Sequence, residues 1–323
     1  MLINSAFKLL CDGYIINDAA ARARRYTGDK SLIDLSLSFP TESVFFRETD
    51  IKREIAKSYE GVSPREVFLF SGKLSALFFC MSLLEKGSDV LIPLPAPYLY
   101  NDAAAVSGMK VSYIFGSAEN AFLPIPQEQN FDALILGSPN SAGCAYSKEA
   151  LKKTAEAVKD NNALFIFDSS MSDYNTSGDP KSIYSIPGAD AFGIELGFYK
   201  RKLCFVIIPE KMRILHRSAE RLNISASQEN KEEPDVRSTE YYLRNAFLLK
   251  TAFRTLSHRV FGGDASPLLF VSGSKKYTSE LYENGIIVSP PALFGIENYF
   301  RVSAFCTFDE CIDACDRIIT LGK

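Results

Sequence analysis

Short apolar runs alternate with helical stretches between residues 66 and 208, and this alternation constrains the fold more than any other feature of the chain. The runs are rich in β-branched and aromatic residues and read EVFLF, DVLIP, KVSYIF, DALILG, ALFIF, ADAFGIE and LCFVII. Strands that alternate with helices form a mostly parallel sheet, because each helix carries the chain back across one face of the sheet. The pattern therefore predicts an α/β domain whose central sheet is covered by helices.

The rest of the chain predicts a smaller second unit. The segment SASQENKEEPDVRST, residues 225–239, is polar and contains a proline, which indicates an exposed connection. A long helical segment follows it, and then two strand-like runs, PLLFVSG and GIIVSP, and a closing helix. We therefore predict a large α/β domain over residues 45–235 and a small α+β domain over residues 236–323, to which residues 1–44 contribute.

Composition narrows the class of protein further. The net charge of −3 gives no reason to expect a nucleic acid or an anionic membrane as partner. No window approaches the roughly eighteen apolar residues of a membrane helix, and charges interrupt the amino terminus too soon for a signal peptide, so we predict a cytoplasmic protein. The seven cysteines match no metal-binding spacing, so we predict reduced thiols and no metal.

Polar residues at the ends of the predicted strands are the candidates for chemistry, because ligands of open parallel sheets bind beyond the carboxyl ends of the strands. Asn140 follows DALILG, Asp168 ends ALFIFD and Lys200 follows the GIEL run. A buried carboxylate needs a cationic partner, and a lysine between apolar runs tends toward its neutral, nucleophilic form. Such a pair suits a pyridine cofactor, which needs an acid against its ring nitrogen and an amine for a Schiff base.

Each candidate also has a purely structural interpretation. Asp168 suits a helix cap and Asn140 suits a turn. Of the two residues that the motifs below add, Tyr98 suits the core and Arg301 suits an exposed strand. Lys200 lies in GFYKRK between two apolar runs, where a solvated hairpin tip is an ordinary explanation. Their joint occurrence in this order favours the functional interpretation.

Several motifs carry a resemblance to a known family. IKREIAKSYEGVSPREVFLFSGK, PAPYLYND, SPNSAG, SIYSIPGADAFGIELGFYK and GIIVSPPALFGIENYFRVSAF resemble segments of the pyridoxal-phosphate-dependent aminotransferases of fold type I. These form class I/II, the aspartate aminotransferase superfamily, and the chain looks most like its LL-diaminopimelate aminotransferases. The resemblance covers nearly the whole chain and implies the aspartate aminotransferase-like fold, pyridoxal 5′-phosphate as cofactor, amino-acid and 2-oxo-acid substrates, and a homodimer.

The resemblance also implies roles for individual residues. Lys200 would be the catalytic Schiff-base lysine, Asp168 would pair with the ring nitrogen, and Asn140 would donate to the ring hydroxyl oxygen. Arg301 would bind the α-carboxylate of the substrate as a bidentate fork. The other implied cofactor-binding residues are Ser71, Gly72 and Lys73 at the phosphate, Tyr98 near the ring face, and Tyr199 and Arg201 beside the lysine.

The chain departs from the family pattern at several of these positions. The glycine-rich turn after the lysine is shortened, and Arg201 is expected to stand in for its phosphate-binding arginine. Gly197 and Tyr199 occupy serine positions, Met171 stands where the family has a tyrosine, and Ser36 and Ser38 replace glycines. A pyridoxal-phosphate-dependent lyase or decarboxylase and a degenerate, non-catalytic homologue therefore remain as alternatives. The candidates for a second carboxylate anchor are Arg24, Arg25, Arg47 and Lys73.

Overall fold

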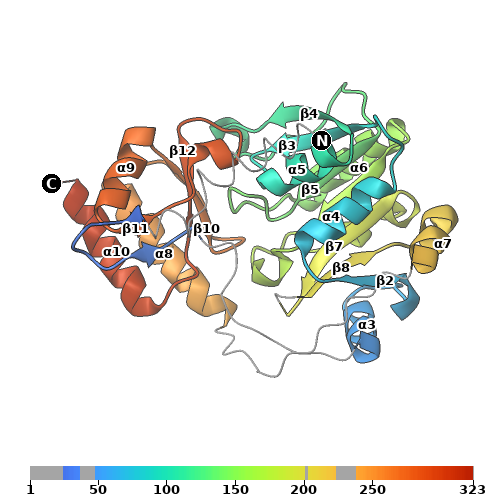
Figure 1. Ribbon diagram of the computed structural model, residues 1–323, viewed down its shortest axis with the longest axis horizontal. Coiled ribbons are helices and arrows are strands. Elements are labelled where there is room, and N and C mark those ends of the chain that lie inside the picture. The colour runs from blue at the N-terminus through green and yellow to red at the C-terminus, as the bar shows by residue number, and fades with distance from the viewer. Residues whose placement is uncertain (1–24, 37–47, 201–202, 223–237, 323) are drawn as a thin grey trace, which may run out of the picture.

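A seven-stranded sheet forms the centre of the larger of two lobes (Figure 1). The computed structural model describes residues 25–36, 48–200, 203–222 and 238–322. The strand order is β2-β8-β7-β6-β5-β3-β4. The strands are β2 (Val67–Phe70), β3 (Asp89–Leu94), β4 (Lys110–Phe115), β5 (Ala133–Gly137), β6 (Leu164–Asp168), β7 (Gly193–Tyr199) and β8 (Leu203–Ile207). Only β8 runs antiparallel to its neighbours, so the predicted α/β fold with a mostly parallel sheet is confirmed.

Helices cover both faces of this sheet. The helices of the large lobe are α3 (Glu48–Lys57), α4 (Lys73–Ser82), α5 (Tyr98–Val106), α6 (Lys148–Asp160) and α7 (Arg213–Leu222). Side chains of α4 and α5 pack with Ile166 of β6. Side chains of α6 pack with Phe167 on the opposite face of the sheet. Because side chains alternate along a strand, Asp168 shares the face of Ile166 and points toward α4 and α5.

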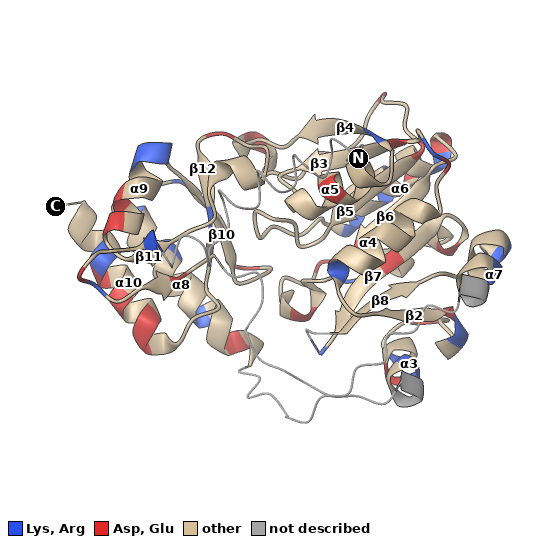
Figure 2. Ribbon diagram, in the orientation of Figure 1, with Lys and Arg blue, Asp and Glu red and all other residues tan. Residues whose placement is uncertain are grey.

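The helix α6 shows how local sequence sets these elements. The Ser147 hydroxyl caps the helix by accepting a hydrogen bond from the Ala150 amide at 3.2 Å. Leu151, Ala155 and Val158 are buried against the sheet, because their spacing of four and three residues places them on one face of the helix. Basic and acidic residues are interspersed along the helices of both lobes (Figure 2).

The smaller lobe contains the carboxyl-terminal residues. Its elements are α8 (Thr239–Thr255), β9 (Val260–Gly262), β10 (Leu268–Ser272), α9 (Lys275–Glu283), β11 (Ile286–Ile287), β12 (Tyr299–Ser303) and α10 (Phe308–Leu321). An antiparallel sheet of order β12-β10-β9 packs with these helices around one apolar core. The strand β1 (Ile33–Asp34) pairs in parallel with β11, so an amino-terminal segment joins this lobe. The predicted connection around residues 224–237 lies outside the described residues.

Short 3-10 helices join several elements. They span Pro64–Glu66, Ala118–Asn120, Ser172–Tyr174, Ile183–Ser185, Ala189–Ala191 and Pro291–Leu293.

Among the helices that the structure describes, none is both long and apolar enough to cross a membrane.

The two lobes touch closely at the SPNSAG turn. Gly143 has a φ of +79°, and a Cβ at this position would lie 2.1 Å from the Leu268 carbonyl oxygen at the start of β10. Only glycine tolerates both the left-handed backbone and this close approach. The turn after β5 can therefore lie directly against the small lobe.

Glu195 of β7 is a buried carboxyl group on the sheet face opposite to Asp168. The Ser182 hydroxyl and the Ile183 amide donate hydrogen bonds to its Oε2 at 2.6 and 3.1 Å. Burial raises its pKa to about 7, although these hydrogen bonds lower it in part. Its side chain is fully buried, so it holds a proton well above the pH at which an exposed glutamate releases one.

We expect this proton to make the stability of the fold depend on pH. Between the usual glutamate pKa of 4.5 and the folded value of about 7, the folded protein holds a proton that the unfolded chain has released. The free energy of unfolding should therefore fall, by about 3 kcal/mol, as pH rises through this window. Urea titrations across the window should show a weaker pH dependence for Glu195→Gln than for the wild type. Identical pH dependence in both proteins would contradict this expectation.

Candidate active site

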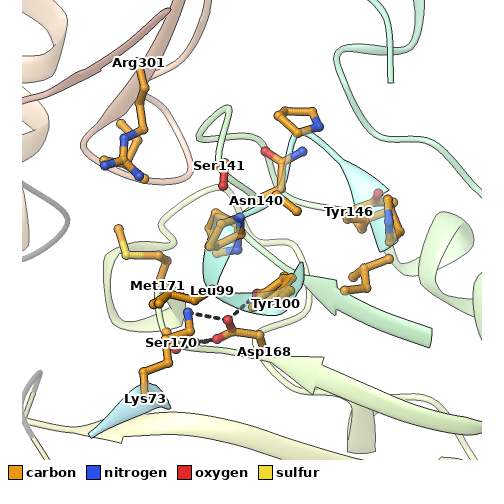
Figure 3. Close-up of a pocket in the computed structure, with 18 of the residues that line it drawn as sticks. Lys73, Leu99, Tyr100, Asn140, Ser141, Tyr146, Asp168, Ser170, Met171 and Arg301 are labelled. Atoms are coloured by element: carbon orange, nitrogen blue, oxygen red, sulfur yellow. Dashed lines mark hydrogen bonds and ion pairs between the residues drawn. The ribbon is translucent and has the colours of Figure 1, made fainter. Parts of the chain in front are cut away.

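A cavity of about 310 Å³ opens beyond the carboxyl ends of β5 and β6, where the small lobe meets the large one. Its lining is mostly apolar. Arg301 lies at one end, Lys73 and Asp168 lie at the other, and Asn140 and Ser141 lie between them (Figure 3). The polar lining residues central to its chemistry are Lys73, Tyr100, Asn140, Asp168, Ser170 and Arg301. This location and volume are typical of ligand-binding pockets, which span roughly 300–1,000 Å³.

Asp168 lies at the centre of one end of the cavity (Figure 3). The Lys73 ammonium at the start of α4 forms an ion pair with its Oδ2, and the Tyr100 hydroxyl of α5 donates to the same oxygen. The amide and the hydroxyl of Ser170 donate to Oδ1, the amide at 2.9 Å. The two helices that cover this face of the sheet therefore each supply one partner to the carboxylate.

The charge of Asp168 survives its burial. Its side chain is 3% exposed, and burial alone raises the pKa of a carboxyl group. The Lys73 ammonium and the hydrogen bonds from Ser170 and Tyr100 outweigh that effect and hold the pKa of Asp168 below its usual value. One end of the cavity therefore contains a carboxylate that is already paired with a cation.

Gly137 makes room for the Tyr100 hydroxyl. It is the residue of β5 that pairs with Asp168, and a Cβ there would lie 3.1 Å from the Tyr100 hydroxyl oxygen. A larger residue would push this hydroxyl away from the carboxylate. The family resemblance implied a role for Tyr98, whereas the role of Tyr100 depends on the direction of α5, which brings its hydroxyl to Asp168.

Arg301 of β12 lies at the other end of the cavity (Figure 3). Its Nη2 donates to the Ser36 carbonyl oxygen at 3.0 Å and to the Ser289 hydroxyl at 3.3 Å. Its guanidinium carbon lies 5.0 Å from the centroid of the Phe294 ring. Burial lowers its pKa to about 10, while the nearby Tyr98 phenol opposes that shift. At neutral pH this buried cation suits a carboxylate ligand.

Asn140 lines the cavity but also shapes its own turn. Its Nδ2 donates to the Phe122 carbonyl oxygen at 2.7 Å, and its Oδ1 accepts from the Ala142 amide at 3.0 Å. The turn-shaping interpretation from the sequence is therefore confirmed, and the role of Asn140 toward a cofactor stays a prediction. Met171 also lines the cavity and is nearly buried, so it presents a thioether where the family has a tyrosine hydroxyl.

The structure brings four of the predicted site residues together at the cavity: Lys73, Asn140, Asp168 and Arg301. Lys73 is also the only one of the four candidate second anchors that lines the cavity within the described residues. Arg25 is exposed, and Arg24, Arg47 and Arg201 lie outside the described residues.

The other predicted residues are not among the described residues that line the cavity: Ser71, Gly72, Tyr98, Tyr199 and Lys200. Gly72 is the N-cap residue of α4, next to Lys73, and Ser71 is exposed. Lys200 lies at the turn between β7 and β8 with an exposed side chain and a φ of +46°. Its predicted role remains a hypothesis.

Known proteins with a similar sequence or structure show which fold this architecture belongs to. No protein-family model matches the chain. The LL-diaminopimelate aminotransferase of Bacteroides fragilis is 27% identical over 329 residues, which cover 85% of this chain and 80% of the relative. The solved LL-diaminopimelate aminotransferase of Chlamydomonas reinhardtii superposes with a TM-score of 0.83 at 18% identity, covering 100% of this chain and 99% of that chain. The aspartate aminotransferase of Thermotoga maritima gives 0.77 at 16% identity, covering 99% and 97%.

The chain has the aspartate aminotransferase fold. The predicted resemblance to LL-diaminopimelate aminotransferases is also confirmed, since proteins of that name appear among both the sequence relatives and the solved structures. Within this fold, the cavity lies at the carboxyl ends of the parallel strands, where open α/β sheets bind their ligands.

Proposed function

We propose that this protein is a pyridoxal-phosphate-dependent aminotransferase that moves an amino group between an amino acid and a 2-oxo acid. One observation carries the proposal: a single cavity joins a buried carboxylate–lysine pair at one end to a buried arginine at the other. The aminotransferase relatives and the shared fold support the same reaction class. No observation on the described residues favours a lyase or a decarboxylase.

The residues of the cavity suit pyridoxal phosphate in charge and in chemical type. Asp168 is a buried carboxylate whose present partner is a cation, so a protonated ring nitrogen would bring the same charge to it. Asn140 would face the ring oxygen, and the free backbone amides at the start of α4 would face the phosphate together with Ser71. When bound, the cofactor supplies an electron sink for the negative charge that develops at the α-carbon of the substrate.

The residues of the chain would divide the remaining work between them. Arg301 would bind the α-carboxylate of the substrate and orient the bond that loses its proton. Met171 and Leu268 line the cavity and would exclude water, which strengthens the charge interactions inside it. A neutral lysine Nζ would take the proton from the α-carbon and hold it for return. The resemblance assigns that amine to Lys200.

The names of the relatives suggest the class of substrate. We propose a long, polar or dicarboxylic amino acid whose α-carboxylate meets Arg301. Ser36 stands where the family has a glycine, and its carbonyl oxygen accepts a hydrogen bond from Arg301. We also propose that the protein is a cytoplasmic homodimer, as the family resemblance implies.

An absorption experiment tests the proposed function. Purified protein is mixed with pyridoxal phosphate, freed of excess by gel filtration, and then given a series of amino acids. We expect a visible absorption band that is retained after filtration and shifts when an accepted amino acid donates its amino group. A double variant, Lys73→Ala with Lys200→Ala, is the control that should lose the band. A wild-type protein that retains no cofactor would contradict the proposal and favour a non-catalytic homologue.

A further inference from the structure

We infer that the hydroxyl of Ser141 binds the carboxylate of the substrate together with Arg301. The inference rests on the proposed function, because it concerns the carboxylate that Arg301 would hold. Ser141 follows Asn140 in the turn after β5 and lines the cavity between its two ends (Figure 3). The position of Ser141, its burial and the lack of a protein partner for its hydroxyl carry the inference.

The Ser141 hydroxyl is buried without a hydrogen-bond partner among the described residues. The residue is 4% exposed, so bulk water reaches little of it. A buried hydroxyl without a partner destabilises a fold, and most buried polar groups in native proteins are therefore paired. Alanine would occupy nearly the same space without this penalty. A serine at this position is explained if a ligand of the cavity supplies the missing partner.

The turn holds Ser141 in place before any ligand binds. The Asn140 Oδ1 accepts hydrogen bonds from the backbone amides of Ala142 and Cys144 at 3.0 and 3.2 Å. The Asn140 backbone amide donates to the Cys144 carbonyl oxygen at 2.9 Å, and Gly143 packs directly against the small lobe. Because the residues on both sides of Ser141 are fixed, a ligand does not have to order this part of the chain, which favours binding.

A carboxylate suits the Ser141 hydroxyl better than a neutral group does. A hydrogen bond to an ionised oxygen is stronger than one to a neutral oxygen, and a carboxylate can accept about four hydrogen bonds. The Nη2 of Arg301 already donates to the Ser36 carbonyl oxygen and the Ser289 hydroxyl. The guanidinium therefore cannot direct all of its N–H donors to the ligand, and Ser141 would supply a further donor.

Ser141 and Arg301 reach the cavity from different lobes. Ser141 lies in the turn that follows β5 of the large lobe, whereas Arg301 lies on β12 of the small lobe. A carboxylate bound by both residues would connect the two lobes, and two separate donors would fix its orientation. The serine hydroxyl is neutral, so it adds this direction without placing another charge in a buried site.

Calorimetric measurement of carboxylate binding tests the inference. Pyruvate and 2-oxoglutarate are titrated into the full chain, both without added cofactor and after loading with pyridoxal phosphate. We expect Ser141→Ala to raise the dissociation constant of both ligands about tenfold, because it removes one hydrogen bond to a charged group. The variant should retain as much pyridoxal phosphate after gel filtration as the wild type does, because the inference assigns the hydroxyl to the substrate.

The variant Ser266→Ala is the matched control. The Ser266 hydroxyl is also buried and has no hydrogen-bond partner among the described residues, but Ser266 is not among those that line the cavity. Both alanine variants should be at least as stable as the wild type in urea, because each loses an unpaired buried hydroxyl. Only Ser141→Ala should bind the carboxylates more weakly.

A double variant tests whether Ser141 and Arg301 bind the same group. In Arg301→Met the carboxylate has lost its cationic partner, so the further change Ser141→Ala should weaken binding by less than about threefold. A full tenfold effect in both backgrounds would mean that the hydroxyl contacts another part of the ligand, which would overturn the inference.

The outcomes separate this inference from the proposed function. Unchanged carboxylate affinity in Ser141→Ala would overturn the inference, even if that variant lost the cofactor band, since the hydroxyl would then bind the cofactor. A wild-type chain that binds neither carboxylate would overturn it as well. A wild-type chain that retains no pyridoxal phosphate, but binds the carboxylates through Ser141, would overturn the proposed function and leave the binding role of Ser141 standing.

Discussion

Replacing Asp168 with alanine is expected to lower the free energy of unfolding by about 3 kcal/mol, because it leaves the Lys73 ammonium in a mostly buried site without its carboxylate. It also removes the acceptor of the Tyr100 hydroxyl, which adds to the cost. Urea unfolding of the variant and the wild type measures the difference. The same variant should fail to retain pyridoxal phosphate after gel filtration.

A double variant that removes both charges is the control for this first prediction. The variant Lys73→Met with Asp168→Leu removes both charges and fills the space with apolar atoms. Since a buried charge left alone costs more than an apolar pair of similar size, the double variant should be more stable than Asp168→Ala. A single variant as stable as the wild type would show that the ion pair contributes little.

Replacing Arg301 with methionine is expected to weaken the binding of a 2-oxo acid at least about 30-fold, since the loss of one partner from a buried charge pair costs roughly 2–5 kcal/mol. Arg301 is the one arginine among the described residues that line the cavity. Calorimetric titration with 2-oxoglutarate measures the dissociation constant. Methionine retains much of the apolar volume of the side chain, so the change tests mainly the charge.

Two controls support the interpretation of the arginine result. Ser289→Ala removes a hydroxyl that Arg301 contacts at 3.3 Å but leaves the guanidinium, so its effect on binding should be several-fold smaller. A ligand whose carboxylates are converted to amides should bind the wild type and Arg301→Met equally. If the arginine variant kept wild-type affinity for the carboxylate, Arg301 would not be the anchor.

The architecture follows from patterns that are visible in the amino-acid sequence. The alternation of apolar runs with helical stretches predicted a mostly parallel sheet, and the sheet has that form. Strand ends also predicted where Asn140 and Asp168 would lie, because parallel strands bring their carboxyl ends to one edge. The motif around Arg301 predicted a residue that does reach the cavity from the other lobe. These features depend on local pattern and strand order, which the chain encodes directly.

Which side chains reach the cavity depends on how the helices and strands pack against one another. Lys73 and Tyr100 contact Asp168 because two helices cover the same sheet face, and a residue's neighbours across a sheet cannot be read from its own segment. The short β7–β8 hairpin decides the position of Lys200, since its pairing continues to Tyr199 and Leu203. The position of Lys200 at the end of a predicted strand made it a candidate for chemistry. The extent of strand pairing and the geometry of the turn determine the direction of its amine.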